Sequence, residues 1–222
     1  MNGLFENRVD AGRQLAARLA GMALERPMVM AVPRGGVPVA IEVARALHAP
    51  LDLLLVRKIG TPLHPEVAVA ALADGHEPAL EIDEETLAAS GLGKDYVMVR
   101  VPLEFQEIER RRGLYMQDCV PEDLKGRDAV LVDDGVATGT SLRAVLRSLH
   151  LRHPRRVVLA VPVAPATELP WLRATVDELV CLRAPTDFVA VSRHYADFSP
   201  VSDEDVVAQL KDFRAARSGN SG

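Results

Sequence analysis

Short apolar runs alternate with amphipathic segments near the start of the chain. Residues 28–32 and 51–56 are apolar runs of strand length, and residues 37–47 between them have helical spacing. Two strands joined by a helix predict a βαβ unit with parallel strands and a right-handed crossover. An amphipathic helix over residues 4–24, with Asp10 as its capping candidate, is expected before this unit.

The second half of the chain repeats this arrangement. Apolar runs at residues 129–132, 156–161 and 175–182 predict three further strands of a buried sheet. Residues 140–150 predict a helix directly after the first of these runs. The alternation favours a doubly wound α/β fold, in which ligands bind outside the carboxyl ends of the strands.

The middle and the end of the chain have a different pattern. Residues 67–73 and 79–82 flank Asp74-Gly75 and predict a β-hairpin, which follows a loop over residues 57–65. Two helices are expected next, a short one capped by Asp83 and a charged one over residues 102–117, and a closing helix capped by Ser202 is expected over residues 203–215.

The length of 222 residues suits a single α/β domain over residues 1–222. Its expected parts are a core at about 26–74 and 127–182, a helical insert at about 75–126, and a hood with the closing helix at about 183–216.

Composition excludes several classes of protein. Apolar residues make up 48% of the chain, which is enough for a real core, and the net charge of −5 argues against nucleic acid or an anionic membrane as a partner. Only two cysteines occur, far apart, so no disulfide framework is expected and a reducing cytoplasm fits. No signal peptide or apolar run of about 18 residues is present, so we expect a cytoplasmic protein without membrane contact.

The clearest chemical motif is the segment 130–141, Val-Leu-Val-Asp-Asp-Gly-Val-Ala-Thr-Gly-Thr-Ser. An apolar strand delivers Asp133 and Asp134 to the edge of the sheet where ligands bind. Two glycines and three hydroxyls then open a helix, whose first backbone N–H groups and dipole favour a phosphate. The carboxylates would repel a bare anion, so they fit sugar hydroxyls or a magnesium ion better. The alternative is an ordinary turn before a capped helix.

This segment resembles the phosphoribosyl-pyrophosphate (PRPP) signature of the type I phosphoribosyltransferases, and the order of the motifs is similar to that of an uncharacterised bacterial branch of that family. The resemblance implies a Rossmann-like parallel sheet with a small hood or insert. It assigns ribose binding to Asp133 and Asp134, which would also hold Mg²⁺ through ribose hydroxyls or water. It assigns 5′-phosphate binding to a run of five residues, Val136, Ala137, Thr138, Gly139 and Thr140.

The resemblance extends to the loop after the first strand, Val32-Pro33-Arg34-Gly35-Gly36-Val37-Pro38. Its glycines permit a close backbone approach, so Arg34, Gly35 and Gly36 are expected to bind pyrophosphate. Arg57 and Lys58, placed at the end of the second strand, are similar to a basic pair that approaches the diphosphate. The alternatives are an ordinary turn for the loop and a solvated pair for Arg57 and Lys58.

The activity that the resemblance implies is transfer of the 5-phosphoribosyl group from PRPP to a small nitrogenous acceptor, such as a nucleobase, with release of pyrophosphate and assistance from Mg²⁺. Such a reaction belongs to nucleotide salvage. The catalytic set would be Arg34, Arg57, Lys58, Asp133 and Asp134. The alternatives are a PRPP-sensing regulator on the same fold and a sugar-phosphate hydrolase.

The sequence does not identify the acceptor. Ala137 stands where members that act on 6-oxopurines have an aspartate, and Glu66 is a weak substitute. Phe188, Tyr195 and Phe198 either stack on a flat acceptor or form an apolar plug. The charged residues of the 102–117 helix form a solvated face or a contact between copies of the chain, so a homo-oligomer is possible.

Overall fold

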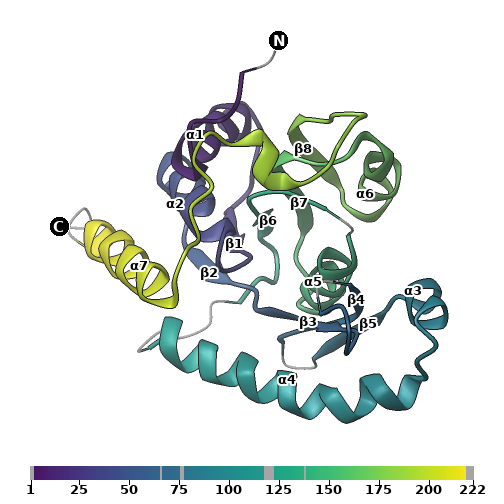
Figure 1. Cartoon of the computed structure of the whole chain (residues 1–222). Coiled ribbons are helices and arrows are strands. Elements are labelled where there is room, and N and C mark those ends of the chain that lie inside the picture. Colours follow the sequence, from purple (N-terminus) through teal and green to yellow (C-terminus); the bar gives the residue numbers. More distant parts are fainter. Residues whose placement is uncertain (1–2, 66, 76–77, 118–122, 138, 219–222) are drawn as a thin grey trace. The chain divides into compact units, whose positions relative to one another are not determined.

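The computed structural model describes residues 3–65, 67–75, 78–117, 123–137 and 139–218 (Figure 1). The chain divides into two compact units. The first comprises Met1–Leu53, Val120–Ala137 and Pro154–Gly222, and the second comprises Leu54–Cys119 and Thr138–His153.

The first unit contains a five-stranded parallel sheet with the strand order β2-β1-β6-β7-β8. The parallel α/β fold expected from the sequence is therefore confirmed. Its central strands are buried except at Arg156, the first residue of β7, which is why they appear in the sequence as continuous apolar runs. The strands are β1 (Met28–Ala31), β2 (Leu51–Leu53), β6 (Asp128–Val132), β7 (Arg156–Val163) and β8 (Glu178–Arg183).

The direction of strand order reverses between β1 and β6, which are direct neighbours. Met28 pairs with Ala129 and Ala31 pairs with Val132. The Val32 N–H continues the ladder by donating to the Val132 carbonyl at 3.0 Å. The loops that follow β1 and β6 therefore leave the same sheet edge side by side, at the point where open α/β sheets bind their ligands.

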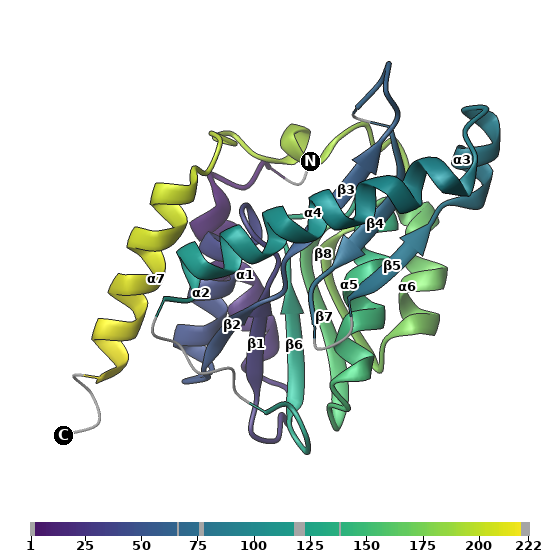
Figure 2. The same ribbon diagram turned by 90° about the horizontal axis from the view of Figure 1, so that it is seen from below.

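Two helices of the first unit, α1 (Arg8–Leu19) and α2 (Gly36–Ala46), pack against each other and cover one face of the parallel sheet (Figures 1 and 2). They approach closely at Gly12, where an added Cβ would lie 2.7 Å from the Val39 carbonyl oxygen. The helix expected over residues 4–24 is shorter at both ends, because α1 begins at Arg8 and ends at Leu19. Its cap is Asn7, whose side chain accepts from the Asp10 N–H at 3.0 Å, while Asp10 accepts from the Glu6 N–H at 3.1 Å.

The C-terminal part of the first unit contains a helix that the sequence pattern did not reveal. This helix, α6 (Leu169–Thr175), precedes β8, so the strand expected from residue 175 begins only at Glu178. Its seven residues are too few to show a helical period clearly. Short 3-10 turns at Ala166–Glu168 and Val191–His194 and the closing helix α7 (Asp203–Ser218) complete the unit.

An ion-pair cluster lies at the amino-terminal edge of the parallel sheet. Asp128 is fully buried and accepts from Arg155 Nε at 2.9 Å, Arg156 Nη2 at 2.9 Å and the Glu25 N–H at 2.9 Å. Burial alone would raise the pKa of Asp128, but these hydrogen bonds and charges outweigh it and hold the pKa below its ordinary value. The cluster joins the ends of β6 and β7.

The second unit contains a three-stranded antiparallel sheet with the order β3-β4-β5. The β4–β5 pairing confirms the predicted hairpin. The strands are β3 (Val56–Gly60), β4 (Ala68–Ala73) and β5 (Ala79–Ile82), and the helices are α3 (Glu84–Ala89), α4 (Lys94–Tyr115) and α5 (Thr140–Leu151). Ile59, Val69 and Val97 lie in its apolar core.

Two expectations for the second unit were wrong. The apolar run 51–56 is not one strand, because β2 ends at Leu53 and Val56 begins β3 in the other sheet. The charged helix begins at Lys94, so Pro102 lies inside α4 instead of at its start. Buried Val97 and the bond from Tyr96 Oη to the Gly60 carbonyl (2.7 Å) hold the turn before the proline in place.

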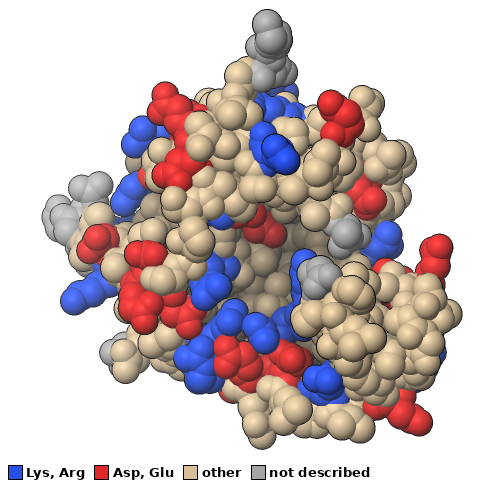
Figure 3. Space-filling model, viewed as in Figure 1, with Lys and Arg blue, Asp and Glu red and all other residues tan. Residues whose placement is uncertain are grey.

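Charged side chains of both signs cover α4 on the face shown in Figure 3. Glu107 accepts from Arg110 Nε at 2.8 Å and from Arg111 Nε at 2.7 Å within the helix, which supports the solvated-face interpretation. No helix within the described residues is long and apolar enough to cross a bilayer.

Candidate functional site

The acidic pair directly follows β6 in the first unit. Asp133 folds back on its own loop, where its Oδ1 accepts from the Asp134 N–H at 2.8 Å. The Asp134 Oδ2 accepts from Arg8 Nε at 2.8 Å, and the side chains of Arg8 and Asp134 are only 11% and 15% exposed. Burial raises the pKa of the Asp134 carboxyl, and the Arg8 guanidinium opposes that rise. The two carboxylates therefore have different surroundings.

The loop after β1 lies against this pair. An added Cβ at Gly35 would lie 2.0 Å from Asp134 Oδ2, and one at Gly36 would lie 2.9 Å from the Val132 carbonyl oxygen. The Gly36 N–H donates to the Val32 carbonyl at 3.0 Å, and the peptide between Pro33 and Arg34 is cis. No side chain larger than hydrogen fits at these glycines without displacing the acidic loop.

Arg34 extends from this loop towards solvent. Its side chain is 44% exposed, and Nη1 lies 3.4 Å from Oδ1 of Asp203 at the start of α7. An exposed guanidinium beside a single carboxylate retains donors for an anion. The two loops that the sequence predicted to act together are thus in contact, and the arginine expected to bind pyrophosphate belongs to one of them.

The loop after β6 continues into α5. Val136 is buried and its N–H donates to the Val163 carbonyl at 2.9 Å, so this N–H is occupied within the fold. Thr138 lies outside the described residues. Gly139 has φ +75°, a left-handed conformation that favours glycine, and α5 begins at the next residue, Thr140, which is buried.

The start of α5 has features of an anion site. No described side chain caps the helix, so its first N–H groups have no capping acceptor among the described residues. The Ser141 hydroxyl is buried and has no hydrogen-bond partner within the described parts of the chain. A buried hydroxyl normally has a partner, and a phosphate at this end of the helix would supply one.

Arg57 and Lys58 occupy a different place from the one expected. Both lie within β3 of the antiparallel sheet in the second unit, not at the end of a parallel strand. The reason is the division of the apolar run 51–56 between two sheets. Arg57 Nε pairs with Glu104 Oε2 at 2.8 Å, whereas the side chain of Lys58 is exposed.

The aromatic residues near the C-terminus form a plug in the first unit. Tyr195 is 4% exposed and its ring lies 5.3 Å from that of Phe5 and 5.0 Å from that of Phe198. Its hydroxyl donates to the Asp134 carbonyl at 2.6 Å, and burial, together with the charge of Asp134, raises its pKa, so it stays a donor. Tyr195 is therefore packed, which favours the apolar-plug alternative for this residue.

Phe188 is placed differently, because it stacks on His194 with ring centroids 5.6 Å apart and an angle of 13° between the planes. Burial and the nearby Arg183 lower the pKa of His194. The Phe188–His194 pair is the remaining candidate for stacking on a flat acceptor. Glu66, the weak substitute for a proton-handling aspartate, lies outside the described residues.

Sequence reasoning missed Arg8 and the contact made by Tyr195. Arg8 is one basic residue in an amphipathic helix, and Tyr195 is one aromatic residue in an irregular segment. Nothing local in the sequence connects either residue to Asp134, which is more than 60 positions from each. Within the described residues, no group of three or more acidic, histidine or cysteine side chains could hold a metal ion without help from a ligand.

Comparisons with known proteins show which family the chain belongs to. The family model described as "Phosphoribosyl transferase domain" matches residues 4–199. The Mycobacterium tuberculosis protein named "Putative phosphoribosyl transferase Rv0571c" is 40% identical over 209 residues. This match covers 93% of the chain and 46% of the relative, so the chain spans about half the length of the curated relatives that it matches.

Among solved structures, TT1426 from Thermus thermophilus is 43% identical, with a TM-score of 0.78 over 95% of this chain and 99% of the other. AQ2163 protein from Aquifex aeolicus is 14% identical, with a TM-score of 0.50 over 80% of this chain and 74% of the other, and shows the shared fold alone. On the family match over most of its length, together with the paired loops at the sheet edge, the chain belongs to the phosphoribosyl transferase domain family.

Proposed function

We propose that this protein transfers the 5-phosphoribosyl group of PRPP to a small nitrogenous acceptor, such as a nucleobase, and releases pyrophosphate with the help of Mg²⁺. Such a reaction would serve nucleotide salvage. The observation that carries the proposal is the contact between the loop containing Gly35 and the loop containing Asp134 at the switch point of the parallel sheet. PRPP has a ribose and a diphosphate, and each loop suits one of them.

The ribose is assigned to the loop after β6. Carboxylate oxygens accept hydrogen bonds from sugar hydroxyls, and Asp133 and Asp134 each offer about four acceptor positions. The 5′-phosphate is assigned to the rest of the same loop, through backbone N–H groups from Ala137 to Thr140 and the hydroxyl of Ser141.

The diphosphate is assigned to the loop after β1. Gly35 and Gly36 allow its backbone to approach a ligand closely, and Arg34 can donate two parallel hydrogen bonds. When the bond between ribose C1 and the diphosphate breaks, negative charge grows on the leaving group, and Arg34 stabilises that charge. A further role of Arg57 and Lys58 at the leaving group stays a prediction.

The residues present fit a magnesium ion, because the acidic pair offers only oxygen ligands. Mg²⁺ keeps several waters and is commonly held by one or two carboxylates together with substrate phosphates. Asp133 and Asp134 would hold it through ribose hydroxyls or water. Bound there, Mg²⁺ would neutralise part of the diphosphate charge.

The direct test is calorimetric titration with PRPP in the presence and absence of Mg²⁺, followed by assays of pyrophosphate release with a panel of purine and pyrimidine bases. We expect PRPP to bind more tightly with Mg²⁺ and one class of base to release pyrophosphate. No binding of PRPP would refute the proposal. Binding without release by any base would instead favour a PRPP-sensing protein.

A further inference from the structure

The first residue of α1 is a cation, which is an unfavourable place for one. The helix dipole places partial positive charge at the amino end, where acidic residues are normally found. Asn7 supplies the side-chain cap of the helix, so Arg8 is not needed for that role. The reason for an arginine here must lie outside the helix.

Arg8 has three contacts in the first unit, and each uses a different part of its guanidinium. Nε donates to Asp134 Oδ2 at 2.8 Å, Nη1 donates to the Ser199 carbonyl at 2.8 Å, and the central carbon lies 3.8 Å from the centroid of the Phe198 ring. Only a planar guanidinium can make all three at once. The side chain is therefore held in one orientation, and it holds Asp134 in turn.

The oxygen of Asp134 that Arg8 binds is also the oxygen that Gly35 approaches most closely. A turn of this carboxylate would either push the loop after β1 away or leave a gap beside it. The orientation of Asp134 therefore determines how far apart the two loops lie. Without Arg8, a buried carboxylate would lose its cation and would gain by turning towards water.

We propose that Arg8 is a positioning residue for the PRPP site: it holds the Asp134 carboxylate against Gly35 and so sets the spacing of the ribose loop and the diphosphate loop. This inference rests on the proposed function. Arg8 acts through Asp134, so replacing Arg8 should have no further effect on PRPP binding once Asp134 has been replaced.

A double-mutant cycle tests this on the whole chain, with calorimetric titration of PRPP and Mg²⁺ and a melting temperature for each variant. Arg8→Gln should weaken PRPP binding by about tenfold, the scale of one lost charge-assisted hydrogen bond. Asp134→Asn should weaken binding at least as much, because Asp134 is also assigned to the ribose, and the double variant should bind PRPP no more weakly than Asp134→Asn alone. Losses that multiply would show that Arg8 and Asp134 act independently and would overturn the inference.

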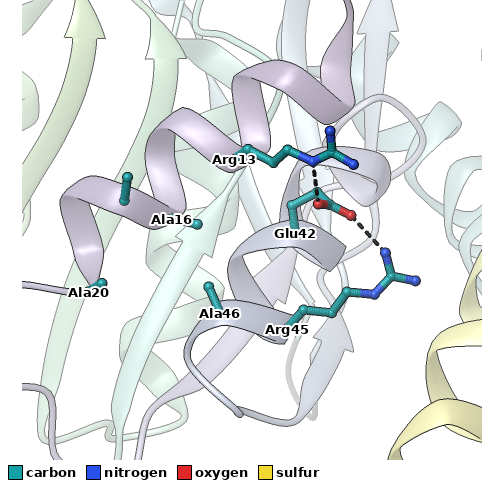
Figure 4. A pocket seen from close by; sticks show the side chains of 7 residues that line it. Arg13, Ala16, Ala20, Glu42, Arg45 and Ala46 are labelled. Atoms are coloured by element: carbon teal, nitrogen blue, oxygen red, sulfur yellow. Dashed lines mark hydrogen bonds and ion pairs between the residues drawn. The ribbon is translucent and has the colours of Figure 1, made fainter.

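Arg13 provides the matched control (Figure 4). It is also an arginine of α1 in an ion pair, 3.1 Å from Glu42, but it lines a shallow pocket between α1 and α2. Arg13→Gln should bind PRPP as the parent protein does. An equal loss of PRPP affinity in Arg13→Gln and Arg8→Gln would show that the loss comes from a less stable α1, and it would overturn the inference.

Arg8→Lys separates positioning from packing, because lysine keeps the positive charge but lacks the planar guanidinium with its several N–H donors. It should bind PRPP more tightly than Arg8→Gln, and equal binding by these two variants would overturn the inference. If Arg8→Gln does not fold, Arg8→Lys in the Asp134→Asn background replaces it, and there the lysine should have no further effect. A parent protein that does not bind PRPP would refute the proposed function itself, whereas a parent that binds it no better than Arg8→Gln does would refute only the role of Arg8.

Discussion

The two neighbouring aspartates after β6 show how far identical side chains can differ in role. Asp134 is held by the largely buried side chain of Arg8, which is 11% exposed, whereas the carboxylate of Asp133 bonds a backbone N–H of its own loop. The negative charge of Asp134 is thus offset within the fold. We expect the response of PRPP binding to Mg²⁺ to depend on Asp133 as well as on Asp134.

Asp133→Asn tests this expectation. The amide oxygen can still accept from the Asp134 N–H, so the loop should keep its shape while one charge is lost. PRPP should bind about tenfold more weakly or worse, and Mg²⁺ should strengthen its binding less than in the parent protein. Titrations at several Mg²⁺ concentrations measure both effects. Unchanged affinity with unchanged Mg²⁺ dependence would show that Asp133 is structural.

Gly35→Ala tests the contact between the two loops. Gly35 has φ −62°, which any residue adopts, so the change is opposed by the clash of the new methyl group with Asp134 and by its close approach to Arg8 Nε. We expect a loss of about 1–3 kcal/mol in the free energy of unfolding and weaker pyrophosphate binding. Gly113→Ala is the control, because no atom lies within 4 Å of its added Cβ in α4, and it should raise stability by about 0.5–1 kcal/mol. Denaturant titration and calorimetry distinguish the two variants.

At this scale the sequence predicted those residues whose chemistry is local. The acidic pair, the glycine loop and the hydroxyl-rich turn lie in continuous motifs, so their types and spacing were enough to propose a site. Arg8 and Tyr195 contribute to the site through their hydrogen bonds to Asp134, which is distant in sequence, and no local pattern reveals such a contact. The partner of the Val136 N–H could not be predicted for a related reason, since it is the Val163 carbonyl of a strand that comes later in the chain.

Among the elements, α5 offers the cleanest separation of binding from stability. Ser141→Ala removes a buried hydroxyl that has no partner in the described structure, so the free energy of unfolding should stay the same or rise. Ribose 5-phosphate should bind more weakly by about 0.5–1.5 kcal/mol if that hydroxyl meets the phosphate. Ser148→Ala in the same helix should lower the free energy of unfolding and leave ribose 5-phosphate binding unchanged, because the Ser148 hydroxyl bonds the Asp74 carbonyl. Thermal melts measure stability and calorimetry measures affinity. Equal changes in both quantities for the two variants would contradict the assignment of Ser141 to the phosphate.

The strand β3 is the element that tests the predicted basic pair. Lys58→Gln removes an exposed charge and should leave the melting temperature unchanged, whereas Arg57→Gln also breaks the ion pair with Glu104. If both cations stabilise the leaving diphosphate, each variant should release pyrophosphate about a hundredfold more slowly. Lys94→Gln, which affects a pair 64% exposed on both sides, is the control. If Lys58→Gln releases pyrophosphate at the same rate as the control, Lys58 does not belong to the site.

Element boundaries were predictable where the hydrophobic period changes at a turn and not elsewhere. The hairpin at Asp74-Gly75 was found because a turn signal separates its strands. The run 51–56 has no such signal, since Leu53, Leu54 and Leu55 are all buried although β2 and β3 belong to different sheets. At Pro102 a turn signal was present but did not mark a boundary. Proline is common in the first turn of a helix, which placed the predicted start there, but Pro102 lies inside α4.

At the scale of the whole molecule, the Asp128 cluster predicts how stability depends on pH. The pKa of Asp128 is lower in the folded protein than in the unfolded chain, where it is about 3.9, so its contribution is present above pH 4 and is lost as the pH falls. Asp128→Asn should lower the free energy of unfolding at pH 7 by about 3 kcal/mol, the lower end for a buried pair, because Arg155 is 36% exposed.

The difference between this variant and the parent protein should shrink below pH 4. Denaturant titrations at pH 7, 5 and 3 measure it. Asp212→Asn, which changes an exposed carboxylate of α7, should differ little from the parent at any pH. A constant difference between Asp128→Asn and the parent down to pH 3 would contradict the assigned role of the ion pairs.

The adjacency of β1 and β6 also bears on how the protein folds. Met28 and Ala129 are paired although roughly a hundred residues separate them, so joining these strands requires the closure of a long loop. Contacts of this kind have high contact order and form slowly. A chain still emerging from the ribosome has its glycine loop complete long before the acidic loop exists to receive it. The capacity to bind PRPP should therefore appear late in refolding and in a single step, when β6 docks beside β1.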